Sequence, residues 1–211
     1  MIKVLIVEDQ RMSRENIERE LSASGKYGIA GSITDAELAL TMCRRQKVDL
    51  VLMDVCTNGK MDGIIAAKEI KESFPGIKVI IITSMVEVSF IERAKAAGAD
   101  SFWYKEDENE PLLEIIEKTM AGEEIYPDKT PSVMIGNASS EDFTPAEIRV
   151  LRLICEGLGY EEIAEKLYIS VNTVKAHTSH ILQKTGYSNK LRLAIAVTNK
   201  NFIIPKLEDE E

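Results

Sequence analysis

The sequence is poor in cysteine and has no long apolar run. Its three cysteines (Cys43, Cys56 and Cys155) lie far apart, are odd in number and form no CxxC pair, which argues against a disulfide scaffold or a zinc site. No apolar segment approaches the roughly 20 residues that a membrane-spanning helix needs. The first residues, MIKVLIVEDQ, are strand-like and lack a signal-peptide pattern. We therefore expect a cytoplasmic protein with no membrane partner.

Acidic residues are missing from one segment of an otherwise acidic chain. The formal net charge is -9, and residues 1–130 hold 17 basic and 24 acidic side chains. Residues 143–200 instead hold 8 basic and 5 acidic side chains, and from Lys166 to Lys200 there are six basic residues and no acidic one. This asymmetry predicts two domains with different partners. On charge alone, a chance cluster of solvated lysines explains the basic segment equally well.

Short apolar segments alternate with helical patterns over residues 1–122, and this predicts an α/β domain. The expected fold is a doubly wound, flavodoxin-like parallel sheet of five strands in the order 2-1-3-4-5. Residues 123–142 contain two prolines, a glycine and a Ser/Asn cluster, so we expect a linker there. Residues 143–205 show four helical patterns, which predict a small all-α domain. The five strands are expected at 2–9, 27–33, 48–54, 77–83 and 100–105.

Carboxylates gather at one predicted edge of this sheet. Glu8 and Asp9 end the first strand and Asp54 ends the third, on either side of the crevice that this strand order creates. Three such carboxylates repel one another unless a hard cation such as Mg²⁺ joins them, and Asp54 could then act as a nucleophile toward a phosphoryl group. Thr83 and Lys105 end the fourth and fifth strands, where a hydroxyl and an ammonium can bind phosphoryl oxygens. Each residue alone is more often an ordinary loop residue, but their common position favours a site.

The motifs of residues 1–122 resemble those of a two-component receiver domain. The matching segments are LIVEDQ, DLVLMD with a following MDG, IIITS, AGAD and FWYK. The resemblance implies that a sensor histidine kinase phosphorylates Asp54. It implies that Glu8 and Asp9 form, with Asp54, an acidic pocket for Mg²⁺. The backbone carbonyl of Cys56 is implied as a further metal ligand.

The resemblance also implies how the phosphorylated state is sensed. Thr83 and Phe102 would form a switch pair, and Lys105 would contact the phosphate. Two features depart from the family pattern. The loop after the acceptor, VCTNGK, lacks the usual proline and is one residue longer, with an Asn58-Gly59 turn signal. A phenylalanine at the switch position has no hydroxyl, so switching would be a packing change.

A helix, a three-residue turn and a longer helix are predicted from the segments YEEIAEKL, YIS and VNTVKAHTSHILQKT. Ser170 is a suitable N-cap for the longer helix. The outward face of that helix carries one long cation, small residues and amides, which suit a helix lying in the major groove of DNA. These outward residues are Asn172, Lys175, Ala176, Ser179 and Gln183.

Residues 143–197 are similar to LuxR-type helix-turn-helix domains, in the segments FTPAEIRVL, EEIAEKLYIS and VNTVKAH above all. With the receiver motifs, the chain resembles the NarL/FixJ family of response regulators over nearly its whole length. The resemblance implies base contacts by Lys175, Ala176 and Ser179. It implies backbone contacts by Thr173, His177 and Lys184, although a packing role for His177 is equally plausible, and Lys190 can neutralise a further phosphate. Residues 189–198 are implied as a homodimer contact that offers Leu191 and Ile195.

The sequence therefore predicts a transcription regulator, not an enzyme, in which phosphorylation of Asp54 promotes dimeric binding to double-stranded DNA. One alternative is a phosphatase with Asp54 as its nucleophile. Haloacid-dehalogenase-like phosphatases have a second aspartate two residues later, where this chain has Cys56. The other alternative is a regulator that works without phosphate, but such a protein is expected to lose the acidic pocket or Lys105.

Overall fold

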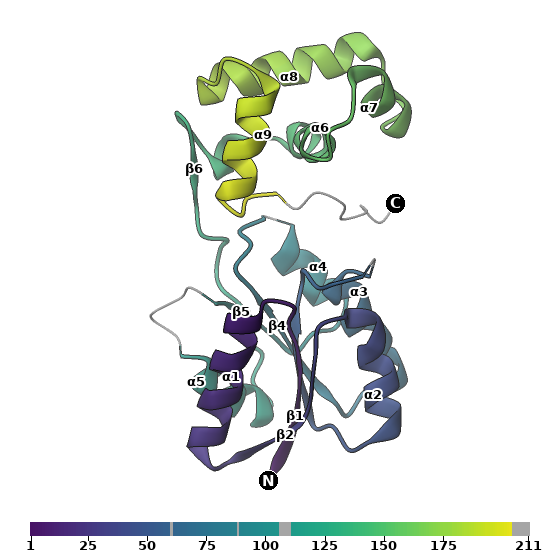
Figure 1. The fold of residues 1–211 in the computed structure, drawn as a ribbon, viewed down its shortest axis with the longest axis vertical. Coiled ribbons are helices and arrows are strands. Elements are labelled where there is room, and N and C mark those ends of the chain that lie inside the picture. The colour runs from purple at the N-terminus through teal and green to yellow at the C-terminus, as the bar shows by residue number, and fades with distance from the viewer. Residues whose placement is uncertain (60, 88, 106–110, 204–211) are drawn as a thin grey trace. The chain divides into compact units, whose positions relative to one another are not determined.

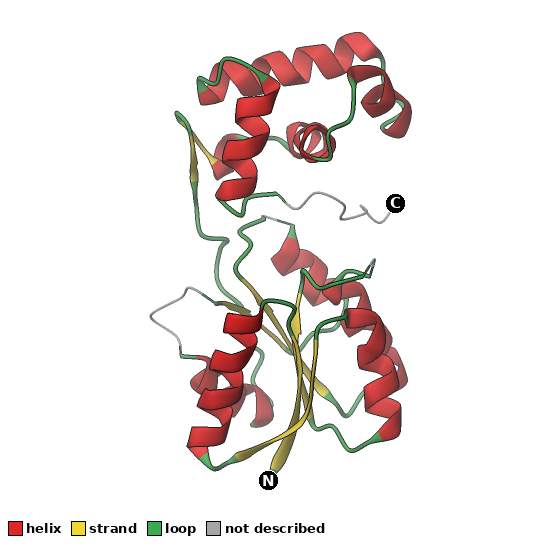
Figure 2. Cartoon of the chain, viewed as in Figure 1, coloured by secondary structure: helices red, strands yellow, loops and turns green. Residues whose placement is uncertain are grey.

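The computed structural model describes residues 1–203 except 60, 88 and 106–110 (Figure 1). It divides into two compact units. Residues Met1–Ser84 and Val88–Lys129 form the first unit. Residues Met85–Glu87 and those from Thr130 onwards form the second. Figure 2 shows that strands dominate the centre of the first unit and helices the second.

A five-stranded sheet forms the centre of the first unit. All its neighbouring strands are parallel, and their order is β2-β1-β3-β4-β5, which confirms the predicted topology. β3 is buried along its whole length, as expected for a central strand covered on both faces. The strands are β1 (Ile2–Val7), β2 (Tyr27–Ile33), β3 (Leu50–Asp54), β4 (Lys78–Thr83) and β5 (Ser101–Tyr104).

Helices cover both faces of this sheet. In Figure 1, α1 and α5 lie on one side, and α2, α3 and α4 lie on the other. The elements are α1 (Arg11–Ser24), the short 3-10 turn η1 (Ala36–Leu38), α2 (Ala39–Arg45), α3 (Gly63–Ser73), α4 (Phe90–Ala96) and α5 (Leu112–Met120). Within the described part of the chain, no helix is long and apolar enough to cross a membrane.

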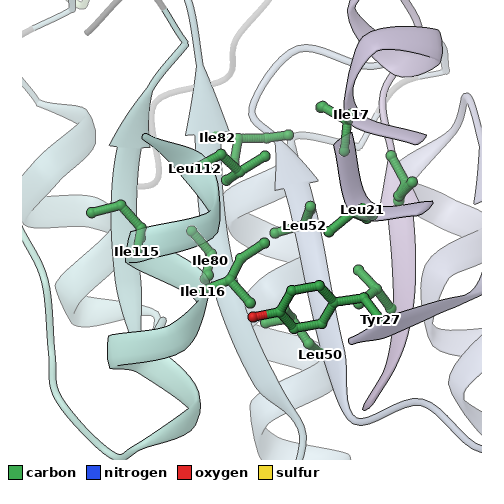
Figure 3. Packing of buried hydrophobic residues seen from close by; sticks show 12 residues of the cluster. Ile17, Leu21, Tyr27, Leu50, Leu52, Ile80, Ile82, Leu112, Ile115 and Ile116 are labelled. Carbon is green, nitrogen blue, oxygen red and sulfur yellow. The ribbon is translucent and has the colours of Figure 1, made fainter. Parts of the chain in front are cut away.

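The buried core on the α1 and α5 side is aliphatic except for the ring of Tyr27 (Figure 3). Alternate residues of the central strands point to this side because successive side chains of a strand face opposite ways. The strands contribute Leu50, Leu52, Ile80 and Ile82, and the helices contribute Ile17, Leu21, Leu112, Ile115 and Ile116. Asp54 continues the same alternation beyond Leu52. The buried core therefore ends where the carboxylates begin.

In its described residues, the second unit contains four α-helices, a 3-10 turn and a small hairpin. The T-x-x-E pattern at Thr144 forms a capping box with Glu147, and Pro145 begins the helix, as this pattern favours. Two apolar clusters hold the helices together, one around Ile181 and one around Val174. The elements are β6 (Met134–Ile135), β7 (Ala138–Ser139), η2 (Ser140–Asp142), α6 (Pro145–Cys155), α7 (Tyr160–Lys166), α8 (Val171–Thr185) and α9 (Lys190–Asn199).

The segment 123–142, expected as a linker, is divided between the two units. Ile125 forms an isolated bridge with Ser101, the first residue of β5. The Ile125 carbonyl accepts a hydrogen bond of 2.8 Å from the Phe102 amide. The β6-β7 hairpin lies in the same segment and packs within the second unit. The domain boundaries at 122 and 143 remain predictions. The predicted helical domain, residues 143–205, ends with residues 204 and 205, which lie outside the described residues.

Candidate functional site

Three carboxylates meet at the carboxyl edge of the sheet. Glu8 and Asp9 follow β1, and Asp54 is the last residue of β3. One oxygen of each lies within 4.8 Å of an oxygen of the other two. Glu8 and Asp54 are buried, whereas Asp9 is half-buried. The sequence prediction that these side chains lie close together at one edge of the sheet is therefore confirmed, and their roles remain predictions.

Lys105 joins this group from the end of β5. Its ammonium lies 2.5 Å from Glu8 Oε2 and 2.7 Å from Asp54 Oδ2. The backbone fixes the position of this side chain, because the Lys105 amide donates a 2.9 Å hydrogen bond to the Thr83 carbonyl and so extends the β4-β5 pairing. One cation therefore offsets the repulsion between two buried carboxylates.

Burial sets the acid-base behaviour of the Asp54 carboxylate. It raises the pKa of Asp54 to about 7, and the neighbouring Glu8 carboxylate adds to this, while the Lys105 ammonium opposes it. The pKa of Asp9 is also raised, first by burial and then by Glu8. A further cation at this edge would favour the ionised form of Asp54, which is the nucleophilic form.

The donor set fits a hard divalent cation. Glu8, Asp9 and Asp54 offer carboxylate oxygens at close range, as Mg²⁺ prefers. The thiol of Cys56 is a poor candidate ligand, because burial and the charge of Asp54 raise its pKa and keep it protonated. The Cys56 amide instead donates a 3.3 Å hydrogen bond to Asp54 Oδ1. A ligand role for the Cys56 carbonyl remains a prediction.

Three residues that the sequence analysis did not select hold Glu8 and its loop. The Ser13 hydroxyl donates to Glu8 Oε2 at 2.6 Å, and the Gln10 amide donates to Oε1 at 3.0 Å. Arg14 donates to the backbone carbonyls of Glu8 and Asp9, at 2.7 and 3.2 Å. All three lie at the start of α1, close behind β1. Their position next to an acidic pair was the only signal that the sequence offered.

The MDG segment that follows Asp54 packs directly against its backbone. A Cβ atom on Gly63 would lie 1.9 Å from the backbone carbonyl oxygen of Asp54, so only glycine fits. The Gly63 amide donates to the Val55 carbonyl at 3.0 Å. Asp62 caps α3 and forms an ion pair with Arg93 of α4. This close approach explains why the MDG segment, which the sequence identified only by resemblance, ends in glycine.

The unusual loop after Asp54 is attached to the loop after β2. The Asn58 amide donates to the Thr34 carbonyl at 2.9 Å, and the Ala36 amide donates to Thr57 Oγ1 at 3.1 Å. Asp35 and Asn58 form an isolated parallel bridge. Gly59 has a φ of 97°, which fits the predicted Asn-Gly turn. We call these contacts the 34–36/57–59 bridge. They hold the longer loop in the absence of the usual proline.

The predicted switch residues lie inside the first unit. Thr83 ends β4 and is fully buried, and Phe102 in β5 is 1% exposed. The Phe102 ring meets the Tyr104 ring edge-on, with centroids 4.9 Å apart. In the sheet register, Thr83 pairs with Tyr104 and Phe102 with Ile81. A movement of Thr83 toward the acceptor would therefore disturb the packing around both rings.

In the second unit, α8 presents the polar face that its sequence predicts. Ser170 caps the helix by accepting a 3.1 Å hydrogen bond from the Thr173 amide. Val174, Thr178 and Ile181 are buried. The predicted base-reading residues Lys175, Ala176 and Ser179 are exposed, as is Thr173, whereas His177 is half-buried.

Two predicted phosphate contacts have partners within the unit. The Lys184 ammonium lies 2.7 Å from Glu147 Oε2 and donates to the Asp142 carbonyl at 2.8 Å. Lys190 lies 4.9 Å above the Tyr160 ring, and its ammonium is 3.5 Å from the Leu158 carbonyl. These contacts give both lysines a structural role in the free protein. Their contacts with DNA remain predictions.

A parallel α/β unit with an acidic edge and a four-helix unit with a polar helix face define a two-part regulator. A family model described as "Response regulator receiver domain" matches residues 4–117, and one described as "Bacterial regulatory proteins, luxR family" matches residues 141–197. The chain therefore belongs to the response regulators with a LuxR-type helix-turn-helix, as in the NarL/FixJ type. Such a protein is a DNA-binding transcription regulator that phosphorylation switches.

Relatives match over nearly the full length. "Response regulator protein VraR" of Staphylococcus epidermidis is 32% identical over 210 residues, covering 96% of this chain and 99% of that protein. VraR of Staphylococcus aureus matches to the same extent. The structure of RcsB from Salmonella enterica serovar Typhimurium, bound to promoter rprA in the presence of phosphomimetic BeF3⁻, has a TM-score of 0.58 at 20% identity. That match covers 94% of this chain and 98% of the other, and it shows a shared fold.

Proposed function

We propose that Asp54 is the phosphoryl acceptor and that a sensor histidine kinase is the donor. An oxygen of the Asp54 carboxylate attacks phosphorus, the bond from phosphorus to the donor imidazole nitrogen breaks, and its electron pair stays on that nitrogen. The observation that carries the proposal is the contact of 2.7 Å between the buried Asp54 and the half-buried Lys105. Lys105 would bind an oxygen of the transferred group, since a phosphoryl group would extend from the same carboxylate.

Glu8, Asp9 and Asp54 would hold Mg²⁺, with the Cys56 carbonyl as a further ligand. When bound, the ion neutralises charge on the transferring phosphoryl group. Other groups of this chain would orient the carboxylates around the ion. Ser13 orients Glu8 through a 2.6 Å hydrogen bond. The Cys56 amide holds the other oxygen of Asp54, which leaves Oδ2 on the Lys105 side.

Phosphorylation would bias the chain toward a DNA-binding homodimer. Thr83 would move toward the phosphoryl oxygens and Phe102 would repack, which changes the surface of the first unit. In the second unit, Leu191 and Ile195 of α9 are 67% and 54% exposed. A second copy of this chain would cover these apolar side chains.

The DNA contact would be made by α8 in the major groove. Lys175, Ala176 and Ser179 would face base edges, and Thr173 and His177 would face the backbone. Lys184 and Lys190 would add phosphate contacts if they exchange their present partners for phosphates. We propose the cytoplasm as the site of action, since chromosomal DNA lies there in bacteria.

The alternatives explain less of the molecule. A haloacid-dehalogenase-like phosphatase would need a second aspartate two residues after the nucleophile, where this chain has the thiol of Cys56. The polar face of α8 would also have no role in such an enzyme. We therefore propose that the protein turns over no separate substrate. A regulator independent of phosphate would leave the Glu8–Lys105–Asp54 arrangement without a use.

Acetyl phosphate labelling with Mg²⁺ tests the acceptor assignment. We expect the natural chain to gain one phosphoryl group, measured as a mass shift, and Asp54→Asn to gain none. Asp49→Asn is the matched control, because Asp49 precedes the same strand β3 and bonds the Lys3 amide at its other end. Labelling of Asp54→Asn at the natural rate, or no labelling of the natural chain, would contradict the proposal.

A further inference from the structure

Tyr168 occupies a turn position that normally requires glycine. It follows Leu167, the C-cap residue of α7, and has a φ of 52°. The Tyr168 amide donates to the Glu165 carbonyl at 3.3 Å, and the Ile169 amide donates to the Ala164 carbonyl at 3.0 Å. These two bonds form a Schellman motif with Tyr168 at the C′ position. Glycine is usual at C′ because a Cβ atom is disfavoured at positive φ.

Packing of the Tyr168 side chain does not offset the energetic cost of this backbone conformation. The Tyr168 side chain is 89% exposed, so burial of its ring does not stabilise the unit. The chain uses glycine at comparable helix ends, Gly25 after α1 and Gly186 after α8. Among the described residues, one other non-glycine has a positive φ, Asn201, and asparagine tolerates this region well. An exposed aromatic residue in a disfavoured conformation points to a function outside folding.

The position of Tyr168 in the helix-turn-helix indicates what it contacts. In this motif the first helix crosses the DNA backbone and the second enters the major groove. The turn between them lies where the chain passes from backbone to groove. Tyr168 is two residues before Ser170, the N-cap of α8, so their Cα atoms are no more than about 8 Å apart. Tyrosine hydroxyls are among the groups that donate hydrogen bonds to DNA phosphates.

We propose that Tyr168 is a DNA-backbone contact, whose hydroxyl donates a hydrogen bond to a phosphate beside the groove that α8 enters. The proposal rests on the DNA-binding function of α8. Because the tyrosine is neutral, it would release no counterion, so its contribution would leave the salt dependence of binding unchanged. Because phosphates are common to all sequences, its contribution would be the same on every duplex. Both properties distinguish it from Lys175.

The test compares DNA affinity with stability in the full chain. The probe is a fluorescein-labelled duplex of mixed sequence about two helical turns long. Tyr168→Asn should raise the urea midpoint of unfolding, because asparagine accepts positive φ. It should also weaken binding by about fivefold to tenfold, with an unchanged salt slope. Tyr168→Phe should weaken DNA binding by the same factor. Its urea midpoint of unfolding should equal that of the natural chain.

Asn201→Gly is the control. It changes the other non-glycine residue with a positive φ among the described residues, and it should leave DNA affinity unchanged. Natural affinity in Tyr168→Asn would overturn the proposal and point to a protein partner for the ring. Natural affinity in Tyr168→Phe would overturn the hydroxyl contact. A lowered urea midpoint in Tyr168→Asn would show that the tyrosine supports the fold. If the natural chain bound no duplex at any salt concentration, DNA binding itself would fail, and this inference with it.

Discussion

The carboxylate site and the outer face of α8 are built in opposite ways. Glu8 and Asp54 are buried, and the half-buried Lys105 is already bonded to both. Lys175 and Ala176 are exposed to solvent. The first site has its geometry before any ligand arrives, while the second acquires its contacts only on DNA. Substitutions in the first should therefore change stability as well as function, and substitutions in the second should change binding alone.

The largest effect is expected for Gly63→Ala. Its Cβ would lie 1.9 Å from the Asp54 carbonyl oxygen, and backbone atoms on both sides would have to move. We expect the free energy of unfolding to fall by about 3 kcal/mol or more and acetyl phosphate labelling to be lost. Gly76→Ala is the matched control, because a Cβ there would meet nothing within 4 Å. Equal stability of both variants in urea would contradict the packing argument.

Lys175→Ala should give the reverse pattern. We expect a loss of about 1–3 kcal/mol in binding to a duplex selected by the natural chain, and a smaller loss on random DNA. The free energy of unfolding should change by less than about 0.5 kcal/mol, since the side chain is exposed. Fluorescence anisotropy and urea unfolding measure the two quantities.

Lys190→Ala provides the contrast within the same domain. It should weaken binding evenly across sequences and flatten the salt slope, as expected for a phosphate contact. Equal losses for Lys175→Ala on selected and random DNA would contradict its role as a base reader. The comparison of buried and exposed sites would fail if Lys175→Ala also unfolded the domain.

Asp54→Asn should stabilise the protein while abolishing labelling. Burial raises the pKa of Asp54 to about 7, so its contribution to stability is full below pH 3.8 and is lost as pH rises through about 7. The gain in the free energy of unfolding of Asp54→Asn over the natural chain should therefore appear above pH 4 and be largest above pH 7. The Lys105 ammonium already limits this pKa shift, and we expect a net gain of about 1–2 kcal/mol for the variant at neutral pH.

Urea unfolding between pH 4 and pH 8 checks this dependence, without metal and then with Mg²⁺. Added Mg²⁺ should stabilise the natural chain, because it binds the folded carboxylates, and should have little effect on Asp54→Asn. A pH profile that is parallel in both proteins would show that Asp54 is not the group that titrates.

The sequence was sufficient for those features that follow from chain order and periodicity. Apolar runs that alternate with helical patterns predicted a doubly wound parallel sheet. The strand order expected for such a sheet then brought Glu8, Asp54 and Lys105 together at one edge. The spacing of Val174 and Ile181 gave the buried face of α8. These inferences need only the geometry of regular elements, which the sequence determines strongly.

Contacts that depend on the exact path of loops could not be predicted in this way. Nothing in the spacing of Ser13 and Glu8 required their hydrogen bond. The family resemblance predicts a DNA contact for Lys184, and its ion pair with Glu147, more than thirty residues away, was not predicted. A basic residue on a helix surface has several possible partners, and packing between helices decides which one it meets.

The 34–36/57–59 bridge permits a test of how strongly the buried site depends on its loop. Thr57→Val keeps the size of the side chain but removes the acceptor of the Ala36 amide. We expect a loss of stability of about 1 kcal/mol, since that amide loses its partner. We also expect slower labelling of Asp54, because the loop that carries the Cys56 amide becomes less fixed. Thr57→Ser retains the hydroxyl and should restore both properties. Slower labelling in Thr57→Ser would instead show that the methyl group matters, and natural labelling in Thr57→Val would show that the acceptor site is rigid without this bridge.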